Sequence, residues 1–284
     1  MKVILIPALT DNYEYLVIDE TTKVAAIIDP VNPEAVEKVL DVAKQENVNL
    51  VAAFVTHHHT DHATGTAALA NATKDIGLKI YAGETERIKA VSKVVNHTEE
   101  FKVGNLKVVA LLTPPHTCSH FCYVISDESK GETAVFTGDC LFSAGCGLFN
   151  EGPPELRAAQ MHDSINVQLA ALPEDTKVYP GHEYTVPNLQ FARIIDPNNP
   201  SVKDRLQWAE NKRKHGEPTI PSTIGEEKSF NPFMRVDNTE LQKRIGAENA
   251  IDAMAKLRQM KNEIHIDFLR DSINWKPEDD IIFK

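Results

Sequence analysis

Short apolar runs bounded by turn residues recur through the first two-thirds of the chain, and their β-branched and aromatic content is typical of strands. Between the early runs, residues 33–45 place apolar side chains at helical spacing, and residues 64–73 are small and Ala-rich. Both segments predict helices. The predicted strands cover residues 3–5, 15–18, 24–28, 51–56, 79–82, 106–112, 121–126, 133–136 and 177–179.

The pattern changes at about residue 183, after which strand-like runs almost disappear. Helical spacing then dominates, interrupted by two Pro-rich stretches. The predicted helices cover residues 188–195, 202–215, 239–245 and 250–262. We therefore predict a β-rich α/β domain over residues 1–182 and a smaller helical domain, with a C-terminal tail, over residues 183–284.

Charge and composition exclude several classes of protein. The 284 residues include 30 basic and 41 acidic side chains, and a net charge of −11 disfavours nucleic-acid binding. No apolar run approaches the roughly 20 residues that span a bilayer, so we expect no membrane association. The first residues lack the features of a signal peptide, which favours the cytoplasm, or mitochondria if a presequence is missing. The four cysteines, without a C-x-x-C, are expected to be free thiols.

The segment T-H-H-H-T-D-H at residues 56–62 follows a predicted buried strand directly. In an extended loop His57 and His59 point the same way and His58 points oppositely. His57 and His59 can therefore bind one metal ion, while Asp61 and His62 can bind a second as the chain turns into a helix. Imidazole and carboxylate ligands together suit zinc, iron or manganese.

Three later strand ends carry the same kind of side chain. His116 follows the run that ends at residue 112, Asp139 follows the run 133–136, and His182 follows the run 177–179. Each of these residues alone is more often a surface or capping residue. Because functional sites in α/β proteins form where strands end, their joint occurrence indicates one metal centre.

These motifs, in this order, resemble the metallo-β-lactamase superfamily. Closer matches at F-T-G-D-C-L-F (136–142), A-G-C-G (144–147), Y-P-G-H-E-Y-T (179–185) and F-N-P-F-M-R (230–235) resemble the glyoxalase II, or hydroxyacylglutathione hydrolase, family. The resemblance covers nearly the whole chain. It implies an αββα sandwich of the metallo-β-lactamase type, followed by a smaller α-helical substrate-binding domain.

The resemblance also implies a cofactor of two divalent metal ions, zinc first, with iron or manganese as alternatives at either position. It implies one assignment of ligands: His57, His59 and His116 for one ion, Asp61, His62 and His182 for the other, and Asp139 bridging both. This assignment agrees with the side-chain directions inferred above for the first motif.

The implied reaction is hydrolysis of S-D-lactoylglutathione, a 2-hydroxyacylglutathione, to D-lactate and glutathione in methylglyoxal detoxification. A hydroxide shared by the two metals would attack the thioester carbonyl and expel a thiolate, a good leaving group with a pKa of about 8–9. Asp61 would hydrogen-bond that hydroxide, and Asp139 would hold both metals, so these two carboxylates are the predicted catalytic residues. The partner is a small molecule, and no obligate protein partner is evident.

Substrate contacts also follow from the resemblance. Tyr184, Arg258 and Lys261 match the residues with which the family binds glutathione, and the two cations lie three residues apart on one predicted helix face. The family pattern after G-C-G is Lys or Arg, then Phe, then Tyr or Phe. Here Leu148 and Asn150 replace the charge and the second ring. Losing one charged hydrogen bond weakens binding by about 1.5–3 kcal/mol, or signals a different thiol.

Several other functions are compatible with part of these motifs. A hydrolase for another thiol's thioester would keep the same metal centre. A persulfide dioxygenase of the same superfamily would use one iron, but it lacks a helical domain with Arg258 and Lys261. A phosphodiester-cleaving enzyme is disfavoured by the acidic charge. A non-catalytic metal-binding or thiol-binding protein is disfavoured by the complete set of ligands.

Overall fold

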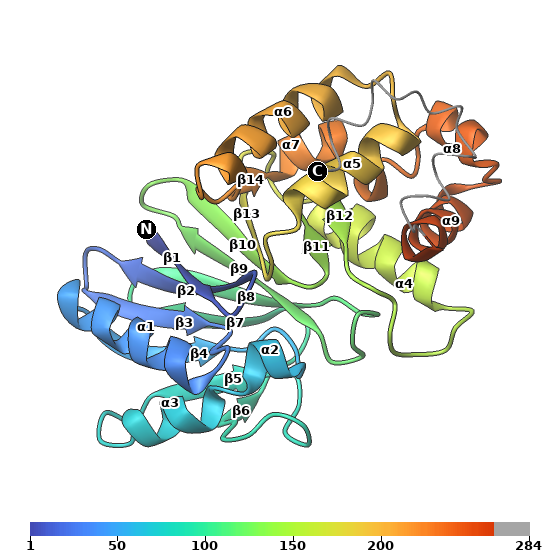
Figure 1. The fold of residues 1–284 in the computed structure, drawn as a ribbon. Coiled ribbons are helices and arrows are strands. Elements are labelled where there is room, and N and C mark those ends of the chain that lie inside the picture. Colours follow the sequence, from blue (N-terminus) through green and yellow to red (C-terminus); the bar gives the residue numbers. More distant parts are fainter. Residues whose placement is uncertain (264–284) are drawn as a thin grey trace.

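The computed structural model describes residues 1–263, in which two six-stranded sheets pack face to face (Figure 1). The first sheet has the order β1 (Lys2–Ala8), β2 (Asn12–Asp19), β3 (Val24–Ile28), β4 (Asn49–Phe54), β5 (Lys79–Ala82), β6 (Lys93–Val94). The second has the order β14 (Ser222–Thr223), β13 (Lys177–Pro180), β10 (Glu132–Gly138), β9 (Phe121–Asp127), β8 (Leu106–Leu112), β7 (Glu99–Val103). Strands β3 to β6 run parallel, as do β10 and β13, whereas the other neighbours are antiparallel.

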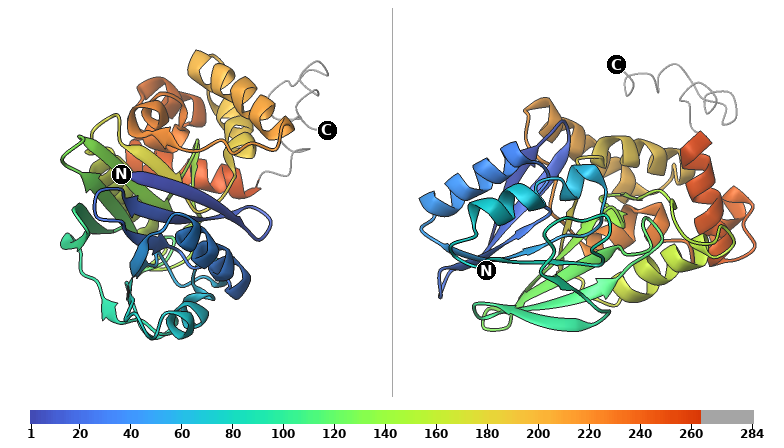
Figure 2. Two further views of the ribbon diagram at one scale, coloured as in Figure 1. Left: turned by 90° about the vertical axis from the view of Figure 1, so that its left-hand side faces the viewer. Right: turned by 90° about the horizontal axis from the view of Figure 1, so that it is seen from below.

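Strand β2 shows how the first sheet is buried on both faces. Tyr13, Tyr15 and Val17 point into the core between the two sheets, whereas Leu16 and Ile18 point to the opposite face. Helices α1 (Pro33–Gln45) and α3 (Thr66–Ala72) cover that opposite face, as the view from below shows (Figure 2). Every residue of β2 is buried, Glu14 included, so neither face of the strand meets solvent.

The outer face of the second sheet is covered by helices from two parts of the chain. Helix α4 (Arg157–His162) continues into a π-helix (Asp163–Leu169), and the remaining helical elements follow β13. These are α5 (Thr185–Ile195), α6 (Pro200–Lys214), α7 (Ile224–Phe230), the 3-10 turn Pro232–Met234, α8 (Thr239–Ile245) and α9 (Ala250–Glu263). Met161 of α4 and Leu257 of α9 belong to one hydrophobic core, so elements before and after residue 183 pack together.

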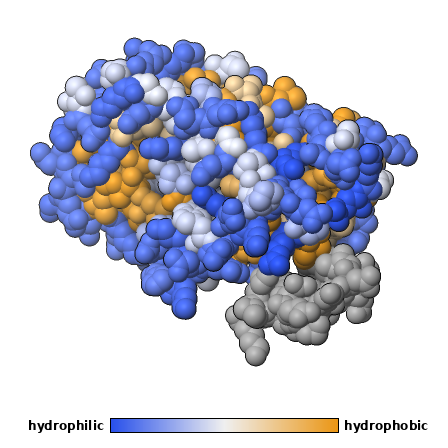
Figure 3. Space-filling view, turned by 90° about the horizontal axis from the view of Figure 1, so that it is seen from above, coloured by the Kyte–Doolittle hydropathy of each residue, from blue (hydrophilic) through white to orange (hydrophobic). Residues whose placement is uncertain are grey.

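Helices α5 and α6 pack on each other through an apolar face. Leu189 and Ala192 of α5 meet Val202 and Leu206 of α6 in a cluster of buried side chains. Seen from above, the surface is mainly hydrophilic and is interrupted by separate hydrophobic patches (Figure 3). None of the helices within residues 1–263 is long and apolar enough to cross a bilayer.

Most predicted elements are present, with instructive differences. The helix over 33–45 and the strands over 24–28, 79–82 and 106–112 agree with α1, β3, β5 and β8. The strand predicted over 51–56 spans Asn49–Phe54, because the Thr56 N–H bonds to the Asp29 carboxylate instead of a neighbouring strand.

The helix predicted over 64–73 corresponds to α3, and the short helix α2 (Thr60–Ala63) precedes it, with a division between them at residues 64 and 65. At the division, Gly65 lies so close to the chain that an added Cβ would be 2.7 Å from the Pro30 carbonyl oxygen. The helical segment 157–169 was not predicted, although Met161, Ile165 and Leu169 recur at helical spacing. The tail 264–284 lies outside the described residues.

Candidate metal centre

Four strand ends meet at one edge of the sandwich and bring seven metal-ligating side chains together. The chain after β4 carries the first motif, and the chains after β8, β10 and β13 carry one residue each. Three groups of ligand atoms lie within 4.8 Å of one another: His57, His59 and His116; His57, His62 and Asp139; Asp61, His62 and His182. The structure thus places all seven residues that sequence analysis singled out at one site.

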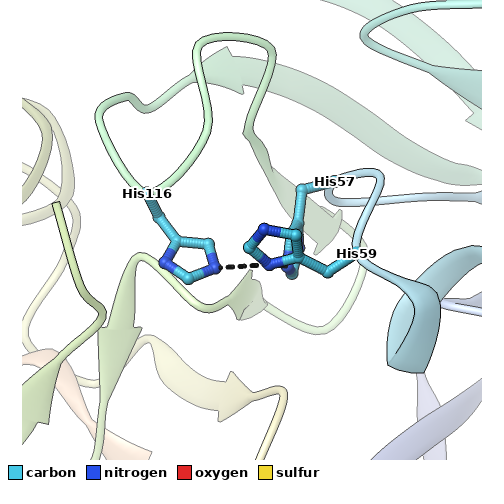
Figure 4. A group of neighbouring side chains, drawn as sticks. All are labelled: His57, His59 and His116. Carbon is cyan, nitrogen blue, oxygen red and sulfur yellow. Dashed lines mark hydrogen bonds between the residues drawn. The ribbon is translucent and has the colours of Figure 1, made fainter. Parts of the chain in front are cut away.

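The first group is formed by three imidazoles on two loops. His57 and His59 come from the chain after β4, and His116 approaches them from the opposite side (Figure 4). The His59 Nδ1 atom lies 3.1 Å from His57 Nε2 and 3.0 Å from His116 Nε2. Three ring nitrogens therefore converge on one point, which is the arrangement that a metal ion requires.

The second group combines one carboxylate with two imidazoles. Asp61 and His62 lie on the single turn of α2, and His182 follows β13. The His62 and His182 Nε2 atoms are 3.2 Å apart, and Asp61 Oδ2 is 3.3 Å from His182 Nε2. The Asn12 amide donates to the Asp61 backbone carbonyl oxygen at 3.0 Å and so helps to orient this turn.

The Asp139 carboxylate stands between the two groups. Its Oδ1 atom is 3.3 Å from His62 Nε2 and 3.5 Å from His182 Nε2, and its Oδ2 atom is 3.5 Å from His116 Nε2. Each oxygen therefore faces a different group. Within the part of the chain that the structure describes, Asp139 Oδ1 is buried and has no hydrogen-bond partner.

Outer hydrogen bonds fix the proton on the far nitrogen of two of these rings. His62 Nδ1 donates to Asp29 Oδ2 at 2.9 Å. The Thr56 hydroxyl donates to the same Asp29 oxygen at 2.8 Å and accepts from His57 Nδ1 at 3.0 Å. In both rings Nε2 is then the nitrogen left to face the site, and a metal ion binds that atom in its unprotonated form.

The other two outer contacts come from different parts of the chain. His116 Nδ1 donates to the Leu148 carbonyl oxygen at 3.1 Å, and His182 Nδ1 donates to Asp11 Oδ1 at 2.8 Å. Sequence analysis missed Asp11 and Asp29. Asp29 stands directly after β3, as several of the candidate ligands follow their strands, and that position was a signal that could have found it, whereas Asp11 lies in the turn between β1 and β2.

The donor atoms fit a pair of divalent cations. Neighbouring ring nitrogens face one another at about 3 Å, close enough to bind the same cation. Burial lowers the pKa of His57 well below its usual value and that of His116 to about 4, so these rings are neutral at physiological pH. The hydrogen bond from His182 lowers the pKa of Asp61, and, against the effect of burial, nearby histidines lower that of Asp139. Against the effect of burial, Asp139 raises the pKa of His62 and Asp61 raises that of His182, so a cation at this position would replace a proton on these two rings.

Two glycines permit the close approach of loops behind the ligands. A Cβ atom on Gly181 would lie 2.5 Å from His62 Cε1 and 2.7 Å from Asp139 Oδ1. A Cβ atom on Gly147 would lie 1.9 Å from the Asp139 carbonyl oxygen and 2.9 Å from His116 Nδ1. Real Cβ atoms do not come within 3.0 Å of other heavy atoms in this way, so only glycine fits at both positions.

His58 points away from the site, as the alternation of side chains predicts. Its ring lies between Glu84 and Glu151, with Nδ1 3.4 Å from Glu84 Oε1 and Nε2 3.6 Å from Glu151 Oε1. The Arg87 guanidinium donates to His58 Nε2 at 3.0 Å and pairs with both glutamates. This cluster ties together three loops beside the metal centre.

Three of the five predicted substrate residues contact other residues near the centre, and two are exposed. The Tyr184 ring stacks on His182, with centroids 4.7 Å apart. Arg258 is buried and donates to the Cys146 carbonyl oxygen at 2.9 Å, and half-buried Lys261 donates to Asn188. Leu148 and Asn150 are exposed on the loop that follows the hairpin 141–146.

Comparison with known proteins places the chain in a family. The model of the metallo-β-lactamase superfamily matches residues 15–182, and that of the hydroxyacylglutathione hydrolase C-terminus matches residues 183–264. The Arabidopsis thaliana protein named hydroxyacylglutathione hydrolase cytoplasmic is 44% identical, covering 93% of this chain and 99% of the relative. The chain belongs to the hydroxyacylglutathione hydrolase family. A hydroxyacylglutathione hydrolase-like protein from Gallus gallus is 41% identical over 92% of this chain and 90% of its own length.

Solved structures agree with the fold. The crystal structure of ETHE1 from Myxococcus xanthus aligns with a TM-score of 0.65 at 25% identity, over 96% of each chain. A metallo-β-lactamase from Staphylococcus aureus aligns with a TM-score of 0.58 at 24% identity, over 88% of this chain and 68% of that one. The predicted α/β sandwich with a helical C-terminal part is therefore confirmed, and the site is one for two divalent metal ions.

Proposed function

We propose that this protein hydrolyses the glutathione thioester S-D-lactoylglutathione to D-lactate and glutathione. The observation that carries the proposal is the convergence of seven imidazole and carboxylate side chains, in a chain of the hydroxyacylglutathione hydrolase family. In this reaction a C–O bond forms between water and the acyl carbon, the C–S bond breaks, and the glutathione thiolate takes up a proton.

In the proposed site His57, His59 and His116 would hold one cation, Asp61, His62 and His182 would hold the other, and Asp139 would contribute to both positions. Two bound cations would supply a water molecule of lowered pKa and would polarise the thioester carbonyl. Residues of the protein itself would orient that water and bind the thiol part of the substrate.

Asp61 and Asp139 are the proposed catalytic residues. Asp61 is held by Asn12, whose amide lies 3.3 Å from Asp61 Oδ2. Because its pKa is lowered, Asp61 stays ionised and can accept a hydrogen bond from the attacking water, which orients that water toward the acyl carbon. Asp139 uses one oxygen on each side, so it keeps the two groups of ligands in register.

We propose that the thiol part of the substrate lies along Tyr184, Arg258 and Lys261. Arg258 and Lys261 add positive charge to a protein of net charge −11, which suits the carboxylates of glutathione. Leu148 is 46% exposed at the edge of this region and offers no charge. We therefore expect glutathione binding to rest on the helical part of the chain more than on the loop with Leu148 and Asn150.

We propose zinc as the metal at both positions and the cytoplasm as the location. Neutral imidazoles with carboxylates are a common set of zinc ligands, and metal analysis of the protein purified without added metal distinguishes zinc from iron and manganese. The Arabidopsis relative is named cytoplasmic, and fractionation of the source cells tests whether that location holds here.

The deciding experiment measures kcat/KM for S-D-lactoylglutathione on metal-loaded protein, with Asp139→Asn as the inactive control. A value of about 10⁴–10⁸ M⁻¹s⁻¹ supports the proposal. No hydrolysis above the control contradicts it. Thioesters of other thiols and oxygen consumption with glutathione persulfide, run in parallel, identify another thiol carrier or a persulfide dioxygenase.

A further inference from the structure

A small hairpin lies between two segments that line the metal centre. Strands β11 (Leu141–Phe142) and β12 (Gly145–Cys146) pair in antiparallel fashion between the ligand Asp139 and Leu148. The Leu148 carbonyl oxygen accepts the hydrogen bond from His116. The position of the hairpin therefore decides where that acceptor lies.

The hairpin also forms a wall on the other side of the site. The Phe142 ring meets the rings of His182 and Tyr184 edge-on, with centroids 5.9 Å and 5.2 Å apart. Any displacement of the hairpin would therefore change both the ligand His116, through Leu148, and the surface around Tyr184.

Two residues per strand cannot hold this hairpin in place, since even longer isolated hairpins are only marginally stable in water. Instead, its backbone is bound by side chains from the helical part of the chain, far away in sequence. These bonds reach the Phe142 and Gly145 carbonyls from Asn231 (3.2 and 3.1 Å), the Ser143 carbonyl from Asn188 (2.9 Å), the Cys146 carbonyl from Arg258 (2.9 Å), and the Ala144 N–H from Glu227 (2.8 Å).

Glu227 is a fully buried carboxylate whose partners are all donors. It accepts from the Ser222 hydroxyl at 2.5 Å, from the Ala144 N–H at 2.8 Å and from the Asn231 amide at 2.9 Å. Burial raises its pKa, and these hydrogen bonds act in the opposite direction. Ala144, the turn residue that it binds, has a φ of 57°, a conformation that non-glycine residues rarely adopt.

The amide of Asn231 has only one orientation that satisfies its neighbours. Its oxygen accepts from the Phe233 N–H at 3.0 Å, so its nitrogen must face three acceptors: the carbonyls of Phe142 and Gly145 and the carboxylate of Glu227. Aspartate has the same shape but no donor, and it would place an oxygen against three oxygens. The site therefore requires asparagine for its chemistry and not for its size.

We propose that Asn231 and Glu227 are positioning residues for the metal centre. They hold the hairpin so that the Leu148 carbonyl stays in line with His116 and Phe142 stays against His182. This inference deepens the proposed function and rests on it for its kinetic consequences. It gives a role to the F-N-P-F-M-R motif at residues 230–235, which the proposed chemistry does not otherwise use.

The test compares Asn231→Asp with Asn238→Asp, the same chemical change in the same helical part. Asn238 uses only its oxygen, which caps α8 by accepting from the Leu241 N–H at 3.0 Å, and aspartate caps equally well. We expect Asn231→Asp to lower kcat/KM by about 10–100-fold, the usual effect of losing an outer contact of a metal ligand. Asn238→Asp should stay within about twofold of wild type.

Two readouts separate positioning from general stability. For Asn231→Asp we expect a raised KM together with a lowered kcat, because both His116 and the surface around Tyr184 would be displaced. We also expect a changed visible absorption spectrum of the Co²⁺-loaded protein, which reports ligand geometry directly. If Asn231→Asp does not fold, Asn231→Ala removes the same donor without adding a charge and should change both readouts in the same direction.

The outcomes distinguish this inference from the proposed function. An inactive wild type contradicts the function, yet the Co²⁺ spectra still test the hairpin. An active wild type whose Asn231 variants retain normal kcat, KM and Co²⁺ spectra overturns the positioning role alone. Glu227→Ala removes the acceptor of the Ala144 N–H and should change both readouts as the Asn231 variants do, whereas Glu227→Gln, whose carbonyl can accept from Ala144 while its NH₂ donates to Ser222, should restore most of both; normal readouts for Glu227→Ala overturn the role of Glu227.

Discussion

The most specific prediction concerns Asp29, because its side chain is buried and both of its carboxylate oxygens accept hydrogen bonds. Oδ1 accepts from the Thr56 N–H at 2.6 Å, and Oδ2 accepts from the Thr56 hydroxyl and from His62 Nδ1. In Asp29→Asn the fixed backbone N–H of Thr56 requires the amide oxygen at the Oδ1 position. The NH₂ group must then face His62 Nδ1, which is itself protonated.

This conflict weakens metal binding in one of two ways. Either His62 loses its acceptor, or its proton moves to Nε2 and blocks the lone pair that faces the site. A hydrogen bond to a charged partner contributes about 1.5–3 kcal/mol, and 1.36 kcal/mol is a factor of ten. We therefore expect metal affinity at the position of Asp61, His62 and His182 to fall roughly 10- to 150-fold. The φ of 52° at residue 29 is one that asparagine also adopts, so the backbone should not change.

The matched control is Asp11→Asn at the partner of His182. The Asp11 side chain is 39% exposed, so its amide can present the oxygen to His182 Nδ1 while water receives the NH₂ group. Competition between the metal-loaded protein and a chelator measures both affinities. The reasoning is refuted if Asp29→Asn binds metal as tightly as wild type, or if Asp11→Asn loses more affinity than Asp29→Asn.

Three further predictions concern packing, pH and metal content. Gly181→Ala should displace His62 and Asp139, which should lower stability by about 1–3 kcal/mol and reduce the number of metal ions bound. Gly225→Ala in α7 is the control, because its added Cβ would come no closer than 3.2 Å to any atom, and it should retain both metals. Thermal melting and metal analysis compare the two variants. Burial lowers the pKa of Lys261 to about 7, so its protonated form is lost as the pH rises above 7. If this cation binds the substrate, kcat/KM should then fall by up to tenfold per pH unit, and Lys261→Arg, which stays charged, should flatten the profile. Removing the metals with a chelator should lower the melting temperature by about 5–10 °C, since a ligand present at 100 times its Kd stabilises the folded protein by about 2.7 kcal/mol. Calorimetry measures this change. Recovery of the melting temperature on adding Zn²⁺ excludes irreversible damage.

The elements of the fold were predictable where local pattern and tertiary position agree. Helix α1 begins after Asn32, whose side chain accepts from the Ala35 N–H, and continues with Pro33 at its first position. Its apolar face and both ends were therefore visible in the sequence. Helix α4 and its π-helical continuation were not predicted, although Met161, Ile165 and Leu169 mark their buried face.

In the site, too, local features were predictable and contacts between distant parts of the chain were not. The separate directions of His57, His58 and His59 come from the alternation of side chains along an extended backbone, which requires no knowledge of the fold. A strand-end position could mark Asp29 as a candidate, but which residue contacts which ligand from behind was not predictable. Asp29 lies 33 residues from His62, and Leu148 lies 32 residues from His116. Nothing in the local pattern says which strand ends become neighbours.

The sequence alone determined the types of ligand, their order and the directions in which the first motif presents them, because these depend on short-range backbone geometry. Only the tertiary structure decided which nitrogen of each imidazole carries the proton and what holds the hairpin 141–146. The Asn231 amide acts on that hairpin across 86 residues to Gly145. Such contacts exist only after two sheets and the helical part have packed, since packing and not sequence distance brings a donor to its acceptor.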